Sequence, residues 1–257
     1  MIRQERERKM EYTFDKALQE ARIVKRNSQF TMNIEMDGEI IKAHCPATTR
    51  IGDVDLAGVA CLVSKSDDPK RKLKYTVEAV SFDDPDAVDK NWVGINLILS
   101  NRIVEFLLNT HQLDEMVSDY DEVKREVFLG SSKLDFLVGN TYLEVKTPLT
   151  TVNVKYGDTI KTKKVTPFSS TDRMVRHVKE LASSLKDHER AILLTVQQYE
   201  ETDVKPHLHS THYEEVKAVM SEAVAKGVES WNISLRFTPT GVSLLKLTNT
   251  TQDLLSY

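Results

Sequence analysis

The stretch "KLDFLVGNTYLEVKT", from Lys133 to Thr147, predicts a tight β-hairpin with one charged face. Strand-forming residues stand on both sides of Gly139-Asn140, and a glycine in the first turn position favours a two-residue type II′ turn. In that register Asp135 faces Glu144, and the alternation of side chains along a strand puts both acids on one face. Carboxylates directly opposite one another, with Cβ atoms roughly 5 Å apart, are destabilising. A divalent cation between them would turn this repulsion into coordination.

The same pattern allows a second interpretation, in which the charged face is simply solvated. Lys133 and Lys146 fall on the face of the two acids, so each carboxylate has a lysine close by. The other face is predicted to be apolar and to hold Leu134, Phe136, Leu143 and Val145. A metal site needs more oxygen ligands than two side chains supply, because Mg²⁺ prefers octahedral oxygen coordination. The candidate third acid is Glu126, on an apparent strand before the hairpin.

Length and composition indicate an ordinary globular protein with one large domain or two modest ones. The chain has 257 residues, of which 40% are hydrophobic and 29% are charged. Cys45 and Cys61 form no CxxC or Cys/His cluster, which argues against a disulfide framework and against a structural zinc site. The charged N-terminus is untypical of a secretory signal, and no apolar run is long enough to span a membrane. We therefore expect a cytoplasmic protein with no membrane partner.

The total charge gives little sign of nucleic-acid binding, whereas its distribution gives some. The formal net charge is −4, yet Lys70, Arg71 and Lys72 are consecutive, and the segment 155–179 carries many basic residues and few acids. Such clusters are usually solvated loops, but a phosphate backbone also requires them. By themselves they do not decide between these two interpretations.

The first third of the chain has an all-β pattern. From Arg22 to about Ile95 short strands alternate with polar turns, including a hairpin at Asp37-Gly38, which is typical of a small barrel or sandwich with an OB-like barrel among the options. The polar segment "DDPDAVDK" around Pro85 marks a domain boundary. We therefore expect a first domain at residues 1–85 and a second at 86–257.

The second domain is predicted to contain a mixed α/β sheet with a polar cleft at one edge. A helix starts near Asn101, strands follow between Glu126 and Val145, and a basic helix opens at Ser170 or Thr171 as its N-cap. The apolar run at 191–196 has the character of a strand buried on both faces. A further helix at about 213–225 and two strands complete the chain.

The acid-to-"EVK" arrangement resembles the PD-(D/E)XK nuclease motif, and the chain from about Leu18 to Leu247 is similar to the sugar fermentation stimulation protein family, SfsA. The resemblance is carried by "ARIVKRNSQFTMNIEMDGEIIKAHCP", "SKSDDPKRKLKYTVEAV", "GINLILSNRIVEFLL", "REVFLG", "SKLDFLV", "YLEVKT" and "TDRMVRHVKEL". It implies an α/β (α+β mixed sheet) fold, with an N-terminal OB-like β-barrel domain followed by a restriction-endonuclease-like domain.

The resemblance also implies a catalytic set. Carried over by position, Glu126, Asp135 and Glu144 match the metal-binding acids of the family, and Lys146 matches the motif lysine. A bound Mg²⁺ or Mn²⁺ would polarise a scissile phosphate, and Lys146 would orient or help to deprotonate the attacking water. The first hypothesis is therefore a metal-dependent nuclease that hydrolyses phosphodiester bonds of DNA or RNA.

Further basic residues are candidates for nucleic-acid contacts. Arg173, Arg176 and His177 lie within about one helical turn, with Arg173 the first candidate for a phosphate contact, although a solvent-exposed helix face is the alternative. Lys133 either contacts phosphate or pairs with an acid at the surface. The complete predicted set is Lys70, Arg71, Lys72, Lys133, Arg173, Arg176 and His177.

Some positions depart from the family pattern and keep other functions open. Ala47 and Thr49 replace an asparagine and a glycine of the family, Phe168 stands where an acid is usual, and Met174 stands where glycine is common. These departures leave room for a non-catalytic, nucleic-acid-binding regulator of sugar metabolism. A third hypothesis is a structural or interaction protein that has kept the fold and binds neither metal nor nucleic acid.

Overall fold

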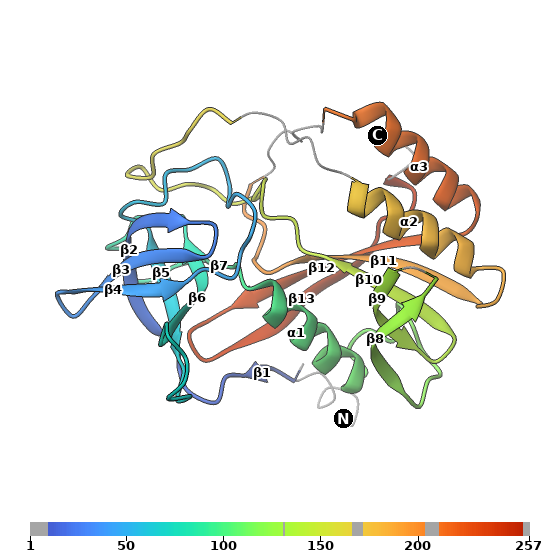
Figure 1. Cartoon of the computed structure of the whole chain (residues 1–257), viewed down its shortest axis with the longest axis horizontal. Coiled ribbons are helices and arrows are strands. Elements are labelled where there is room, and N and C mark those ends of the chain that lie inside the picture. Colours follow the sequence, from blue (N-terminus) through green and yellow to red (C-terminus); the bar gives the residue numbers. More distant parts are fainter. Residues whose placement is uncertain (1–9, 131, 166–171, 204–210, 254–257) are drawn as a thin grey trace, which may run out of the picture.

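Short strands with alternating buried and exposed residues close an N-terminal barrel (Figure 1). Its strands are β2 (Gln19–Ser28), β3 (Thr31–Met36), β4 (Glu39–His44), β5 (Ala60–Lys65) and β6 (Tyr75–Ser81). Antiparallel pairing runs from β4 through β3, β2 and β5 to β6, and parallel pairing of β4 with β6 closes the ring. The predicted OB-like barrel is therefore confirmed. The computed structural model describes residues 10–130, 132–165, 172–203 and 211–253.

The barrel runs into a second sheet without a break. In spatial order the added strands are β7 (Trp92–Gly94), β12 (Glu229–Phe237), β11 (Arg190–Gln197), β10 (Thr141–Lys146), β9 (Ser132–Val138) and β8 (Val123–Leu129). β7 pairs with both β6 and β12 and so joins the two parts. Parallel pairing of β10 with β11 and of β11 with β12 makes this sheet mixed, as predicted.

Both chain ends add to the joint between the two parts. β13 (Gly241–Asn249) pairs with β12, and the short β1 (Tyr12–Thr13) pairs with β13. Close packing at β7 leaves no room beside Gly94, where an added Cβ would lie 2.7 Å from the Cβ of Gln198. The barrel and the second sheet therefore share a tightly packed border.

Helices cover both faces of the second sheet (Figure 1). Alternate residues of β11 separate the two sides: Ile192 and Leu194 pack in the cluster that contains α1 (Leu97–Asn109). Ala191 and Leu193 pack in the cluster that contains α2 (Asp172–Ser184) and α3 (Tyr213–Ala225). This alternation confirms that β11 is buried on both faces.

The helix boundaries agree with the sequence in part. α1 begins earlier than expected, because the side chain of Asn96 accepts hydrogen bonds from the backbone N–H groups of Ile98 and Leu99 and so caps the helix. α3 has the predicted extent. The predicted N-cap residues of α2, Ser170 and Thr171, lie outside the described residues. No helix in the described part of the chain is long and apolar enough to cross a membrane.

Candidate active site

The hairpin of β9 and β10 has the predicted register next to the turn, but the predicted pairing of Asp135 with Glu144 is not part of the ladder. Val138 pairs with Thr141, and Phe136 pairs with Leu143. Gly139 adopts a φ of 55°, the positive value that the first position of a type II′ turn requires. The ladder ends at Leu143, just before the acids, and the backbone N–H of Val145 instead donates to Oδ2 of Asp135 at 2.8 Å.

The predicted apolar face of the hairpin is wrong at Leu134. Phe136 packs in the cluster that contains α1, whereas Leu134 packs in the cluster beneath α2 and α3. The change of side occurs at Asp135, opposite Glu126, whose φ of 54° departs from strand geometry. Irregular backbone at this point lets the strand present side chains to different layers, which strict alternation does not allow.

Asp135 is held by a helix on one side and by the neighbouring strand on the other. Nδ2 of Asn101, on α1, donates to Oδ1 of Asp135 at 2.7 Å. The hydroxyl oxygens of Ser100 and Thr147 lie 2.8 Å apart and link α1 to the segment after β10. Burial raises the pKa of Asp135, and the nearby Glu144 raises it further, while the two hydrogen bonds and Lys146 act against this shift. The predicted repulsion between the acids is therefore present in the fold.

Glu144 is the most deeply buried charged group of the site. Its residue is 3% exposed, and Oε1 accepts hydrogen bonds from Nζ of Lys146 and from Nδ1 of His177. Its other oxygen, Oε2, is buried and has no hydrogen-bond partner within the described part of the chain. Because native proteins rarely leave a buried carboxylate oxygen without a partner, this atom needs an explanation.

The side chain of His177 points into the protein interior and not toward solvent. The residue is 4% exposed and contacts Glu144 from α2, so the nucleic-acid contact predicted for it does not fit this arrangement. The neighbouring Arg176 is exposed and keeps that predicted role. The side chain of Arg173 and all of Phe168 lie outside the described residues.

Glu126 stands opposite Asp135 in the pairing of β8 with β9, but its side chain is paired with a lysine at the surface. It is exposed, and Nζ of Lys133 is 2.6 Å from its Oε2, which holds the pKa of Glu126 below its ordinary value. Among the residues that the structure describes, no three His, Cys, Asp or Glu side chains are grouped so that they could hold a metal ion. The role of Glu126 as a direct or water-mediated ligand stays a prediction. Lys133 is a surface ion-pair partner here, which was one of its two expected roles.

The remaining basic residues are on the barrel. Lys70, Arg71 and Lys72 lie in the loop between β5 and β6, and both lysines are exposed. The guanidinium of Arg71 donates to the hydroxyl of Thr76. Because Asp135 and Glu144 lie on β9 and β10, one nucleic acid would have to reach across the two parts of the molecule to touch both regions (Figure 1).

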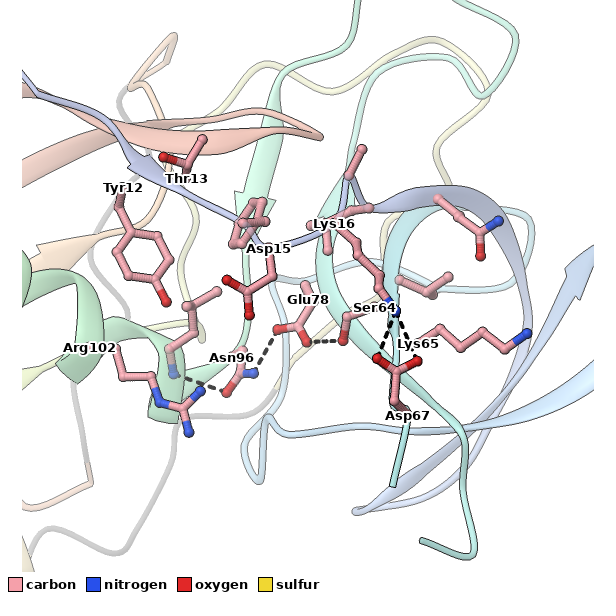
Figure 2. A pocket seen from close by; sticks show the side chains of 16 residues that line it. Tyr12, Thr13, Asp15, Lys16, Ser64, Lys65, Asp67, Glu78, Asn96 and Arg102 are labelled. Atoms are coloured by element: carbon pink, nitrogen blue, oxygen red, sulfur yellow. Dashed lines mark hydrogen bonds and ion pairs between the residues drawn. The ribbon is translucent and has the colours of Figure 1, made fainter. Parts of the chain in front are cut away.

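A polar cavity lies on the other side of the first turns of α1 and is not part of this site (Figure 2). Its volume is about 520 Å³, and the segment 12–19, β5 and α1 form its walls. Within it Glu78 accepts hydrogen bonds from Ser64 and, at 2.6 Å, from Nδ2 of Asn96 (Figure 2). Arg102 lines this cavity, whereas its neighbour Asn101 contacts Asp135.

The donor set of Asp135 and Glu144 fits a hard divalent cation. Carboxylate oxygens are the ligands that Mg²⁺ and Mn²⁺ prefer, and one or two carboxylates with water and phosphate usually suffice for Mg²⁺. The unpartnered Oε2 of Glu144 and the raised pKa of Asp135 are both features that a cation would relieve. Sequence reasoning missed the contacts of Asn101 and His177, although "SNRIVEF" and "VRHVKEL" both stood out in the sequence.

Comparison with known proteins accounts for both parts of the fold. Residues 24–95 match the family model described as "SfsA N-terminal OB domain", and residues 98–241 match "Sugar fermentation stimulation protein RE domain". The chain belongs to the sugar fermentation stimulation protein family. The family resemblance inferred from the motifs is therefore confirmed, and the two matched regions adjoin at the first residues of α1.

Members of this family from cyanobacteria are similar along nearly the whole chain. The sugar fermentation stimulation protein homolog of Synechococcus elongatus is 33% identical over 241 residues, which cover 91% of this chain and 95% of the relative. The homolog of Microcystis aeruginosa is 33% identical over 235 residues, covering 88% and 91%. The solved structure titled "The structure of Pyrococcus Furiosus SfsA in complex with Ca2+" has a TM-score of 0.71 at 18% identity and covers 93% of this chain and 97% of that one. At this identity the likeness shows a shared SfsA fold.

Proposed function

We propose that this member of the SfsA family is a metal-dependent nuclease that hydrolyses phosphodiester bonds of DNA or RNA. The observation that carries the proposal is the pair of acids formed by the half-buried Asp135 and the buried Glu144, with Lys146 in contact with Glu144 and one oxygen of Glu144 without a hydrogen-bond partner in the described part of the chain. Two neighbouring carboxylates, one buried and one half-buried, cost stability, and such groups cluster at functional sites. Glu144 shares β10 with Lys146, and two carboxylates with a neighbouring lysine are groups that metal-assisted phosphate hydrolysis can use.

Asp135 and Glu144 would hold the cation, Mg²⁺ or Mn²⁺, which when bound acts as a Lewis acid on a phosphate oxygen. Support comes from the P. furiosus structure of the same fold, whose title reports a complex with Ca²⁺, a cation that also takes oxygen ligands. Asn101 and the backbone N–H of Val145 keep the carboxylate of Asp135 in one orientation. Both donors favour its charged form, which is the form that binds a cation.

Lys146 has a separate role in this proposal. Its side chain is 29% exposed, so Nζ can meet substrate while it also contacts the buried Glu144. From there it would orient the attacking water and offset negative charge at the phosphate as the transition state forms. Arg176 and the basic loop at 70–72 would contact the phosphate backbone of the substrate, DNA or RNA, and Lys133 would do so on leaving its ion pair with Glu126.

The test is cleavage of end-labelled single- and double-stranded DNA and RNA with Mg²⁺, Mn²⁺ or EDTA. The purified wild type is compared with Glu144→Ala and with Glu39→Ala, which removes an exposed acid from β4 on the barrel. We expect metal-dependent products from the wild type and from Glu39→Ala, and none from Glu144→Ala. Absence of cleavage of every substrate, with binding that weakens as salt rises, would contradict the proposal and favour a non-catalytic regulator. Absence of binding as well would favour an interaction protein.

A further inference from the structure

We propose that His177 is a positioning residue: it holds one oxygen of Glu144 so that the other oxygen stays available to the cation. The inference rests on the proposed function and names a residue of the same site. It departs from the surface role that the sequence predicted for His177. His177 is buried, its Nδ1 contacts Oε1 of Glu144, and the other oxygen of Glu144 has no hydrogen-bond partner in the described part of the chain.

His177 is fixed by the packing of α2. Val175 and Val178 on either side of it are buried in the cluster that also includes residues of β11 and α3. A buried ring between such neighbours has little freedom to turn toward solvent. The contact to Glu144 therefore joins two rigid elements, α2 and β10, which is how a site is held in a fixed geometry.

The hydrogen bond from His177 sets the orientation of the Glu144 carboxylate. Nδ1 of His177 lies within hydrogen-bond distance of Oε1 of Glu144 and, at 3.5 Å, of Nζ of Lys146. A carboxylate only accepts hydrogen bonds, so we assign the proton to Nδ1, which then donates to Oε1 and accepts nothing from Lys146. Lys146 donates to the same oxygen, and Oε2 receives no hydrogen bond within the described part of the chain. Rotation about the last side-chain bond of a glutamate is broad, so Lys146 alone, on a flexible stem, would not hold this orientation.

Other roles for His177 fit the structure less well. A general base or a nucleic-acid contact needs a ring that reaches water or substrate, and the side chain of His177 is only 5% exposed. Carboxylates that bind metals are themselves held by hydrogen bonds, and loss of such a partner typically costs 10- to 100-fold in metal affinity or activity. A partner of the metal-binding carboxylate is therefore the role that burial and geometry support.

The experiment measures Mn²⁺ affinity of the full chain by calorimetry. His177→Phe keeps an aromatic ring but removes both nitrogens, and His177→Asn keeps an amide donor near the position of Nδ1. Lys179→Ala removes an exposed side chain of the same helix and is the control. We expect binding about 10- to 100-fold weaker in His177→Phe, recovery to within a few-fold of wild type in His177→Asn, and no change in Lys179→Ala.

A second measurement does not depend on metal or on the folding of His177→Phe. The Nδ1 proton of His177 should give a downfield proton NMR signal in the metal-free wild type that disappears in Glu144→Ala. Absence of a signal that depends on Glu144 would overturn the inference. The inference would also be overturned if a folded His177→Phe bound Mn²⁺ as tightly as the wild type, or if His177→Asn bound it no more tightly than His177→Phe. Either result would leave the nuclease proposal intact. Failure of the wild type to bind Mn²⁺ through Glu144 would instead remove the proposed function, and this inference with it.

Discussion

Substitution of Asn101 by alanine removes one of the two hydrogen bonds that hold the carboxylate of Asp135, so its contribution to stability can be measured. Nδ2 of Asn101 donates to the carboxylate at 2.7 Å, and a hydrogen bond to a charged group contributes about 1.5–3 kcal/mol. Alanine is favoured over asparagine inside a helix by about 0.5 kcal/mol, which offsets part of the loss. We therefore expect Asn101→Ala to lower the free energy of unfolding by about 1–2.5 kcal/mol at neutral pH.

The pH dependence identifies the cause. Burial already raises the pKa of Asp135, and a carboxyl whose folded pKa exceeds its unfolded value costs stability as pH rises from the unfolded to the folded pKa. Asn101→Ala removes a hydrogen-bond donor to the charged carboxylate, which raises the pKa of Asp135 in the folded protein further. Ionisation of Asp135 therefore lowers the free energy of unfolding more in the variant than in the wild type at neutral pH. Once both proteins have Asp135 protonated, the difference shrinks. The loss in Asn101→Ala should therefore be largest at pH 7–8 and decline as pH falls toward the unfolded value of about 3.9.

The assay is urea unfolding, followed by circular dichroism, at a series of pH values between 8 and 4. Asn109→Ala is the matched control, since it makes the same change in an exposed residue of α1 that has no side-chain hydrogen bond within the described part of the chain. That control should be equal to the wild type or slightly more stable at every pH. A loss in Asn101→Ala that is independent of pH, or no loss at all, would refute the assignment of this hydrogen bond to the charged carboxylate.

Other predictions concern the border between the two parts and the buried thiols. Gly94→Ala should destabilise the protein by about 1–3 kcal/mol, seen as a lower Tm, because the new Cβ would lie 2.7 Å from Gln198; an unchanged Tm would contradict the packing. Asn96→Ala should lower the free energy of unfolding in urea by about 1 kcal/mol, because it removes the cap of α1 and a hydrogen-bond donor to Glu78. An unchanged free energy of unfolding would argue against the cap. Burial raises the pKa of the Cys61 thiol to about 12, so native protein at pH 8 should leave it unlabelled by a thiol reagent, and unfolding in urea should expose it; rapid native labelling would contradict its burial.

The elements themselves could be predicted from local patterns. The hairpin of β9 and β10, the burial of β11 on both faces and the extent of α3 all follow from residues close together in the sequence. Alternation and helical spacing are local properties, because backbone geometry repeats every few residues. The barrel and the family membership could also be predicted from the sequence, since family motifs occur in order along most of the chain.

The side-chain contacts of the candidate site could not be predicted from local sequence patterns. Asn101 and Asp135 are 34 residues apart, and Glu144 and His177 are 33 apart, so each contact depends on how a helix crosses the sheet. The same holds for Leu134, which faces the layer of α2 and α3 next to the irregular backbone at Glu126, the residue opposite Asp135. A pattern of residue types along one strand contains no information on which helix covers it.

The sequence by itself determined most of the secondary structure, the hairpin pairing next to its turn and the presence of two acids and a lysine on adjoining strands, because neighbouring residues set these features. Only the tertiary structure decided which oxygens have partners, why Glu126 lies at the surface beside Lys133, and that His177 turns inward. The physical reason is that burial and hydrogen bonding are set by the packing of distant segments against one another, and a difference of a few ångströms in that packing changes a surface histidine into the partner of a buried carboxylate.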